Sequence, residues 1–243
     1  MPVADDAADP LAWLSSLEGV PSGFAAARDG VDAMLRDRGM RRTTPEQTAE
    51  SLLRGAHASA VLEGSGSSLD EVRDGQGDET AQAALRVSAE LLSLVPVLAR
   101  SPLQAFARLH TLAGTGLVDD DRLGRPVTDA AAERVGTLAQ TLLGTSAPAM
   151  LVAAVAHAEI AVVAPFASHN GIVARAVERL LLVARGVDPA SLVVPEAGHL
   201  MLRREYESNL RGYRDGGRAG MHSWLLYSGE AYARGAEASP LRD

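Results

Sequence analysis

The sequence contains no cysteine and no lysine. The absence of cysteine excludes disulfide bonds, thiolate metal ligands and thiol nucleophiles, and it leaves the redox compartment open. Because there is no lysine, all 23 basic residues are arginine, which we attribute to genome base composition rather than to function. The formal net charge of -8 argues against non-specific nucleic-acid binding, which needs a basic face.

Signals for secretion and for membrane insertion are also lacking. Residues 1–23 have no basic start followed by an apolar core. The longest apolar stretches are interrupted by His157, Glu159 or Arg185, so we expect no membrane span and, by default, a cytoplasmic location. A chain of 243 residues that is 47% hydrophobic is long enough to bury a sizeable core, as one domain with an extension or as two small domains.

Apolar residues recur at helical spacing along most of the chain, which predicts an all-α fold. Thr44-Pro45 opens one helix, which runs to Leu62 and ends at Gly64. A start at Asp9-Pro10 predicts a first helix that is interrupted by Pro21 and Gly23. Further helices are predicted at 24–38, 78–98, 101–114, 129–143, 148–163, 169–185, 199–213 and 221–235, and a solvated basic turn at 39–42. We expect glycines 212, 216, 217 and 220 to loosen the chain between the last two helices.

The stretch from 156 to 185, AHAEIAVVAPFASHNGIVARAVERLLLVAR, joins two apolar helices by a short loop. Pro165 ends the first helix because its ring clashes with the preceding turn. The second helix opens at His169, with Ser168 or Asn170 as a cap, and its free N–H groups favour an anion. Arg175 lies one to two turns further on, so the sequence predicts an anion site at this helix start.

These residues resemble the signature of Fic-domain proteins, H-P-F-x-x-G-N-G-R-x-x-R, and in this register five positions match: Pro165, Phe166, Asn170, Gly171 and Arg175. Four positions depart from it. Ala164 replaces the histidine, His169 the first glycine and Ile172 the first arginine, while Ser168 replaces an acidic metal ligand. His157 fits a histidine often found two turns upstream of the signature.

A second element lies upstream, where Ser59, Glu63 and Gly64 resemble the inhibitory motif Ser/Thr-x-x-x-Glu-Gly/Asn of Fic proteins. In that family the glutamate pairs with the second signature arginine and blocks productive nucleotide placement. The resemblance therefore implies a contact between Glu63 and Arg175 in the unliganded protein.

The interval 116–129 is polar and irregular. By resemblance it is a short β-hairpin flap that includes Gly124 and Arg125 and holds a target segment by strand addition. The acidic triplet 119–121 is expected to be a solvated loop, and His110, in the helix before it, a core or boundary residue. The implied organisation is an N-terminal helical extension (1–57), a Fic-like core (58–235, with the inhibitory helix at about 44–64 and the signature at about 157–175) and a tail (236–243).

Active Fic proteins transfer AMP, or another phosphate-containing part of a nucleotide, to a protein hydroxyl. Here the departures fall on the base, the metal ligand and one phosphate arginine, so we expect no metal site, no need for Mg²⁺ and no AMP transfer. The first hypothesis is a pseudoenzyme, a binding or regulatory module with a residual pocket for phosphate or an ATP-like nucleotide. Its pocket would use His169, Asn170, Gly171 and Arg175, and a protein partner would occupy the flap groove.

The alternative is an enzyme of altered chemistry, such as nucleotidyl or other phosphate-group transfer in a repurposed pocket, centred on His169 and Arg175. A capping or surface-loop role is the simpler interpretation of His169. Ser168 is not expected to act as a nucleophile, because adjacent residues rarely meet as nucleophile and base. The oligomeric state stays open, with a homodimer as one option.

Overall fold

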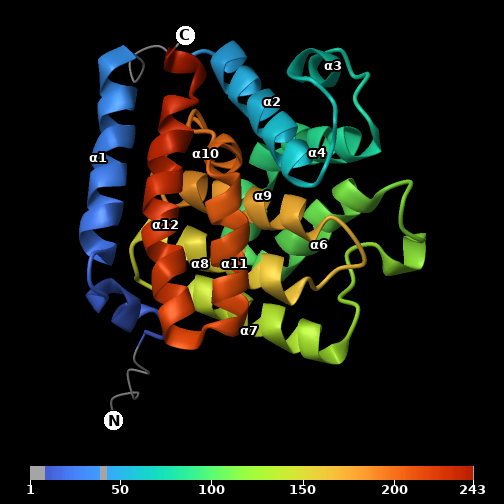
Figure 1. Cartoon of the computed structure of the whole chain (residues 1–243). Helices are drawn as coiled ribbons and strands as arrows, with labels where there is room; N and C mark the ends of the chain where they lie inside the picture. The colour runs from blue at the N-terminus through green and yellow to red at the C-terminus, as the bar shows by residue number, and fades with distance from the viewer. Residues whose placement is uncertain (1–8, 39–42, 243) are drawn as a thin grey trace.

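The computed structural model describes residues 9–38 and 43–242, and these ranges hold helices and loops but no strand (Figure 1). The α-helices are α1 (Val20–Arg38), α2 (Pro45–Leu62), α3 (Leu69–Arg73), α4 (Glu79–Glu90), α5 (Val95–Arg100), α6 (Pro102–Gly114), α7 (Asp129–Gly144), α8 (Ala149–Val163), α9 (Asn170–Ala184), α10 (Pro195–Met201), α11 (Arg203–Asp215) and α12 (Gly217–Glu237). Short 3-10 helices lie at Ala12–Ser16, Leu91–Leu94, Asp120–Arg122 and Pro240–Arg242. The all-α prediction is confirmed; the predicted basic turn at 39–42 lies outside the described residues.

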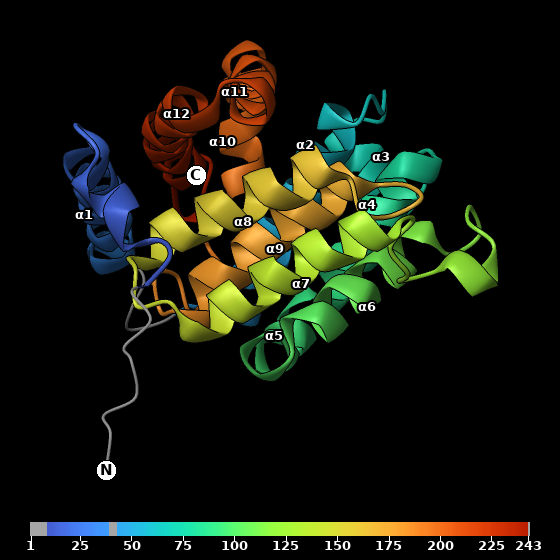
Figure 2. The ribbon, with the colours of Figure 1, turned by 90° about the horizontal axis from the view of Figure 1, so that it is seen from below.

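The centre of the molecule is the antiparallel pair α8 and α9. Figure 2 shows this pair between a layer formed by α10, α11 and α12 and a layer formed by α5, α6 and α7. Helix α8 carries apolar side chains on all its sides, and ten of its residues are buried. A helix with this composition is stable only inside a core, so α8 and α9 form the rigid base of the loop that joins them.

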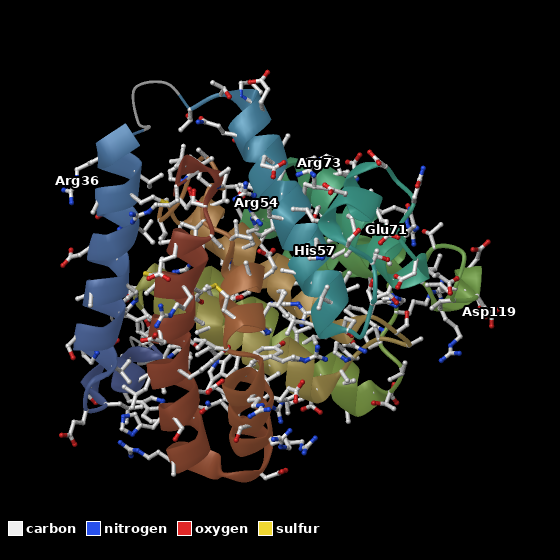
Figure 3. The ribbon with its side chains drawn as sticks, turned by 45° about the horizontal axis from the view of Figure 1, so that its top comes forward. Arg36, Arg54, His57, Glu71, Arg73 and Asp119 are labelled. Carbon is white, nitrogen blue, oxygen red and sulfur yellow. The ribbon has the colours of Figure 1, made fainter. Side chains whose placement is uncertain are left out.

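Helix α2 lies across α9 and begins with a capping box, in which Thr44 and Gln47 satisfy each other's backbone N–H groups. Along its inner side, Thr48 Oγ1 donates to the carbonyl of Ala190 at 2.9 Å, and the buried Arg179 donates to the carbonyl and the hydroxyl of Ser51. Figure 3 shows Arg54 and His57 on the outer part of α2 beside Arg73 of α3. These contacts hold the N-terminal half of α2, and the bonds from Arg175 to Ser59 hold its C-terminal end near the start of α9.

Several helix boundaries differ from the prediction. The helix expected from Asp9-Pro10 is the 3-10 helix Ala12–Ser16, and the helix expected at 78–98 is divided into α4, a 3-10 turn and α5. Helix α12 begins at Gly217 and not at 221. Pro21 lies in the first turn of α1 and does not interrupt it, because the first helical N–H groups need no partner within the helix. The predicted helix 199–213 is two helices, α10 and α11, which meet at Leu202.

The glycines between α11 and α12 do not loosen the chain. A Cβ atom at Gly220 would overlap the carbonyl oxygen of Gly212, so these two residues let the helices pack at backbone contact. Close packing of this kind replaces the flexibility that the glycine content suggested.

The predicted β-hairpin at 116–129 is wrong. Its backbone N–H groups are used elsewhere: Gly124 N–H donates to His110 Nδ1 at 2.9 Å and Val127 N–H donates to the carbonyl of Pro165 at 2.8 Å. Gly124 has φ +70°, which favours glycine. The interval therefore folds as a 3-10 turn and an extended segment that docks on α6 and on the loop between α8 and α9.

One helical run, Glu79–Arg100, is long and apolar enough to cross a membrane by length and composition. It comprises α4, the 3-10 turn Leu91–Leu94 and α5, and it packs on α2, α6 and α9. These are the contacts of a core helix in a bundle.

Candidate functional site

The loop between α8 and α9 is held in an unusual backbone conformation. Ala164, at its start, has φ 46° and His169, at its end, has φ 52°, both in the left-handed region that glycine favours. The side chain of Asn170 ties the loop together, because its Oδ1 accepts from Phe166 N–H at 2.9 Å and its Nδ2 donates to the Phe166 carbonyl at 2.8 Å. Asn170 therefore shapes the loop.

A second layer of contacts supports this loop from α6. The ring of His110 stacks on Phe166, with 4.5 Å between the ring centroids. Burial lowers the pKa of His110 to about 4, so the ring is neutral; Nδ1 accepts the Gly124 N–H and Nε2 carries the proton. His110 is a buried core residue, as one of the two predicted options had it.

The start of α9 presents free backbone N–H groups. No side chain caps the helix, and the first bond to its backbone runs from Val173 N–H to the carbonyl of His169. The Glu63 carboxylate lies against this turn, at a place where a Cβ atom on Gly171 would overlap Glu63 Oε1. An anionic group of the protein therefore occupies the predicted anion site, and Gly171 gives it room.

The predicted contact between Glu63 and Arg175 is confirmed, with Glu63 Oε1 2.8 Å from Arg175 Nη2. Three more hydrogen bonds hold the guanidinium: Nε donates to Ser59 Oγ at 2.9 Å, Nη2 to the Ser59 carbonyl at 3.1 Å and Nη1 to the Tyr206 hydroxyl at 3.0 Å. The Arg175 side chain is only 1% exposed, whereas that of Glu63 is 30% exposed. The arginine is thus fixed in the protein, and the glutamate is the partner that is free to move.

The remaining signature positions separate into buried and accessible ones. Ile172 is 2% exposed and belongs to the hydrophobic core. Ala164 is exposed. Ser168 and His169 are partly exposed, and Ser168 Oγ lies 2.9 Å from His169 Nδ1, a contact that the sequence argued against.

The charge state of His169 follows from its surroundings. Burial lowers its pKa; Glu63 and Glu79 act in the opposite direction, and Arg86 adds to the lowering. The ring is therefore neutral at pH 7, as expected for a histidine at a helix N-terminus.

A buried polar cluster behind Arg175 was not predicted. Glu178 Oε2 lies 2.9 Å from both His157 Nδ1 and His199 Nε2, and Glu178 Oε1 accepts from the Tyr232 hydroxyl at 2.9 Å. The outer ring nitrogens contact Tyr206 and Tyr227, so a chain of hydrogen bonds runs from Arg175 through Tyr206 and His157 to Glu178. The one signal in the sequence was a glutamate within the apolar helix α9.

Three of these residues, His157, Glu178 and His199, form the one group of metal-ligating residue types found in the described part of the chain, with ligand atoms within 4.8 Å of one another. Both imidazoles face the same carboxylate oxygen at hydrogen-bond distance, and all three side chains are fully buried. Burial lowers the pKa of His157 to about 4, while the two imidazoles hold the pKa of Glu178 far below its ordinary value. Two imidazoles hydrogen-bonded to one carboxylate oxygen account for this geometry, and we interpret the cluster as structural.

No protein-family model and no curated protein matches the sequence. Solved structures do match. A Fic family protein from Desulfovibrio desulfuricans G20 superposes with a TM-score of 0.74 at 17% sequence identity, covering 91% of this chain and 74% of that one. A fragment of Fic-1 from C. elegans gives a TM-score of 0.66 at 16% identity, covering 88% and 70%. The chain therefore has the Fic fold.

Proposed function

We propose that this protein is a Fic-fold pseudoenzyme: a regulatory module that binds a nucleotide or a small phosphorylated ligand at the start of α9 and is held closed by Glu63. The single observation that carries the proposal is the Glu63 carboxylate, which lies against Gly171 and is paired with Arg175. A carboxylate thus lies beside the first turn of α9, where the helix dipole favours negative charge.

The negative charge and partial exposure of Glu63 indicate that a ligand of the same charge can replace its carboxylate. Glu63 is partly exposed and ends α2, so its side chain can leave without unfolding the helix. A phosphate group that replaced it would lie beside the first turn of α9 and would reach the same Arg175 Nη2. The ligand must displace Glu63, and the free-energy cost of this displacement lowers its affinity. The unliganded protein is therefore in an inhibited state.

Two features argue against AMP transfer. Ala164 has no group that takes a proton, and a general base contributes about 10²–10⁴-fold to such reactions. The guanidinium of Arg175 is also already bonded to Ser59 and Tyr206 from two sides, so removal of Glu63 does not free it to follow a phosphate. The site therefore supports ligand binding better than AMP transfer.

The interval from Leu117 to Val127 is proposed as the place for a protein partner. Both of these side chains are exposed apolar residues. Since Val127 N–H already donates to Pro165, strand addition at this N–H group is blocked, and a partner would dock through the side chains.

The direct test of the pseudoenzyme proposal is a radiolabelling assay with ATP and Mg²⁺, on the wild-type protein and on Glu63→Gly. We expect no AMP incorporation above background in either protein, because the base position remains Ala164. Incorporation that appears in Glu63→Gly and is lost in a Glu63→Gly, Arg175→Ala double variant would overturn the proposal.

A further inference from the structure

Ser168 and His169 form a close pair at the end of the loop between α8 and α9, directly before α9. Ser168 Oγ lies 2.9 Å from His169 Nδ1, and both residues are partly exposed. In the tautomer with a proton on Nε2, Nδ1 accepts the hydroxyl proton of Ser168. This is the first relationship that a nucleophilic serine requires, a hydroxyl hydrogen-bonded to a base.

The pair is held on a rigid support. Both side-chain polar groups of Asn170 bond the backbone of Phe166, the ring of His110 stacks on Phe166, and Val127 N–H bonds the Pro165 carbonyl. His169 itself is held at φ 52°, a strained conformation of the kind that persists where the surrounding structure imposes it. The backbone that carries the pair is therefore held in place.

The third requirement is a set of donors for negative charge. The first turn of α9 follows His169 directly, and no side chain caps it. The Glu63 carboxylate lies against Gly171 in this turn, which is an independent sign that an anionic group is stabilised there. An oxyanion that develops beside Ser168 would meet the same kind of donors.

We propose that Ser168 is a nucleophilic serine, activated by His169, that reacts with small acyl esters. Ser168 Oγ attacks the carbonyl carbon, and its proton passes to His169 Nδ1. The bond to the leaving oxygen then breaks, and that oxygen takes the proton from His169 and departs as an alcohol. Water hydrolyses the acyl-serine by the same steps in reverse, with His169 as base. The inference does not depend on nucleotide binding, because the electrophile is an uncharged ester.

The charged and titratable groups that act on His169 are Glu63, Glu79, Arg86 and His110. Burial lowers the pKa of His169 below its ordinary value, so the base is available at neutral pH. Glu63 acts against the reaction, because its negative charge lies against Gly171 in the first turn of α9.

The test uses an alkyl fluorophosphonate probe on the full-length protein, with the modified peptide located by mass spectrometry. Ser168 Oγ forms the bond to phosphorus, fluoride leaves, and the serine proton goes to His169. We expect labelling at Ser168, its loss in Ser168→Ala, and no change in the control Ser93→Ala, since Ser93 is an exposed residue bonded only to Glu90. The same Ser168→Ala change should remove the burst of p-nitrophenol from p-nitrophenyl acetate.

His169→Gly removes the imidazole and keeps the backbone conformation, because glycine accepts the left-handed region without strain. The variant therefore tests the role of the base alone. We expect this variant to keep the wild-type melting temperature or exceed it, and to label about 100-fold more slowly. Glu63→Ala should label faster. The wild-type rate should rise with pH and become constant once His169 is deprotonated, at a lower pH than for an ordinary histidine because burial lowers the pKa of His169. Equal labelling of wild type and His169→Gly, or labelling that continues to rise with hydroxide, would overturn the proposal whether or not the protein binds nucleotides.

Discussion

Glu63 and Arg175 are 112 positions apart in the chain, yet their side chains meet at 2.8 Å over the start of α9. The arginine is buried and held by Ser59 and Tyr206, whereas the glutamate is partly exposed and has its carboxylate against Gly171. One relationship thus links the end of α2 to the first turn of α9 and places a carboxylate where a phosphate would bind.

Gly171 provides a test of this arrangement by comparison of two backgrounds. In wild type, Gly171→Ala should destabilise the protein, because the added Cβ overlaps Glu63 Oε1 and separates it from Arg175. In a Glu63→Ala background the same change should cost clearly less, because the overlap with Oε1 is gone and the Cβ meets Arg175 Nη1 at 3.1 Å. Urea unfolding of the four proteins gives the cycle. Equal effects in both backgrounds would mean that Glu63 does not occupy this space.

The two partners should differ in their importance for stability. Arg175→Leu removes a buried cation and its hydrogen bonds to Ser59 Oγ and the Tyr206 hydroxyl, so we expect a loss of about 3–5 kcal/mol. Glu63→Gln keeps an oxygen acceptor at a partly exposed position and should cost about 1 kcal/mol or less. The exposed pair of Arg203 and Glu207 supplies the control, with Glu207→Gln near zero. A Glu63→Gln loss as large as that of Arg175→Leu would contradict this ranking.

Backbone strain at Ala164 predicts an unusual response to glycine. A non-glycine residue in the left-handed region costs about 1–2 kcal/mol, which exceeds the entropic cost of a new glycine in the unfolded chain, about 0.4–1 kcal/mol. Ala164→Gly should therefore raise the free energy of unfolding slightly. Ala161→Gly, one turn earlier inside α8, should lower it by about 1 kcal/mol. Chemical denaturation of both variants measures their free energies of unfolding. Equal losses of this free energy in the two variants would refute strain at Ala164.

Burial of His157 in the polar cluster makes the free energy of unfolding depend on pH. The pKa of His157 falls from 6.5 to about 4 on folding, so the unfolded chain binds a proton below pH 6.5 that the folded chain does not. Stability is therefore complete above pH 6.5 and declines toward pH 4, by about 3 kcal/mol from this residue; His110 contributes in the same direction.

His157→Gln should make this decline shallower, whatever its effect on stability at neutral pH. His222→Gln is the matched control, since His222 lies at the surface and bonds the carbonyl of Glu18. The measurement is the midpoint of urea unfolding at several pH values between 7 and 4. An unchanged slope in His157→Gln would show that this histidine is not buried in its neutral form.

The sequence predicted those parts of the molecule that depend on local signals or on a recognisable motif. Thr44-Pro45 marked the start of α2, Pro165 the break after α8, and the family resemblance paired Glu63 with Arg175. The flap was predicted wrongly, because whether its N–H groups bond each other or bond His110 and Pro165 depends on tertiary packing.

Long-range side-chain contacts were beyond reach for the same reason. Nothing in the spacing of Tyr206, Glu178 and His199 indicates that three helices bring them together behind Arg175. The adjacency of Ser168 and His169 argued against a contact between their side chains. The contact forms in a turn where His169 has a left-handed backbone.

The most direct measurement of the central claim is the affinity for ATP, by isothermal titration calorimetry without added metal, of wild type, Glu63→Ala and Glu79→Ala. Both variants change the net charge equally, and both residues act electrostatically on His169, but only Glu63 lies on Gly171 and pairs with Arg175. We predict that Glu63→Ala binds ATP at least about tenfold more tightly than wild type, a difference of about 1.4 kcal/mol, and that Glu79→Ala does not. Equal affinities in the two variants, or no binding by Glu63→Ala, would contradict an anion site held closed by Glu63.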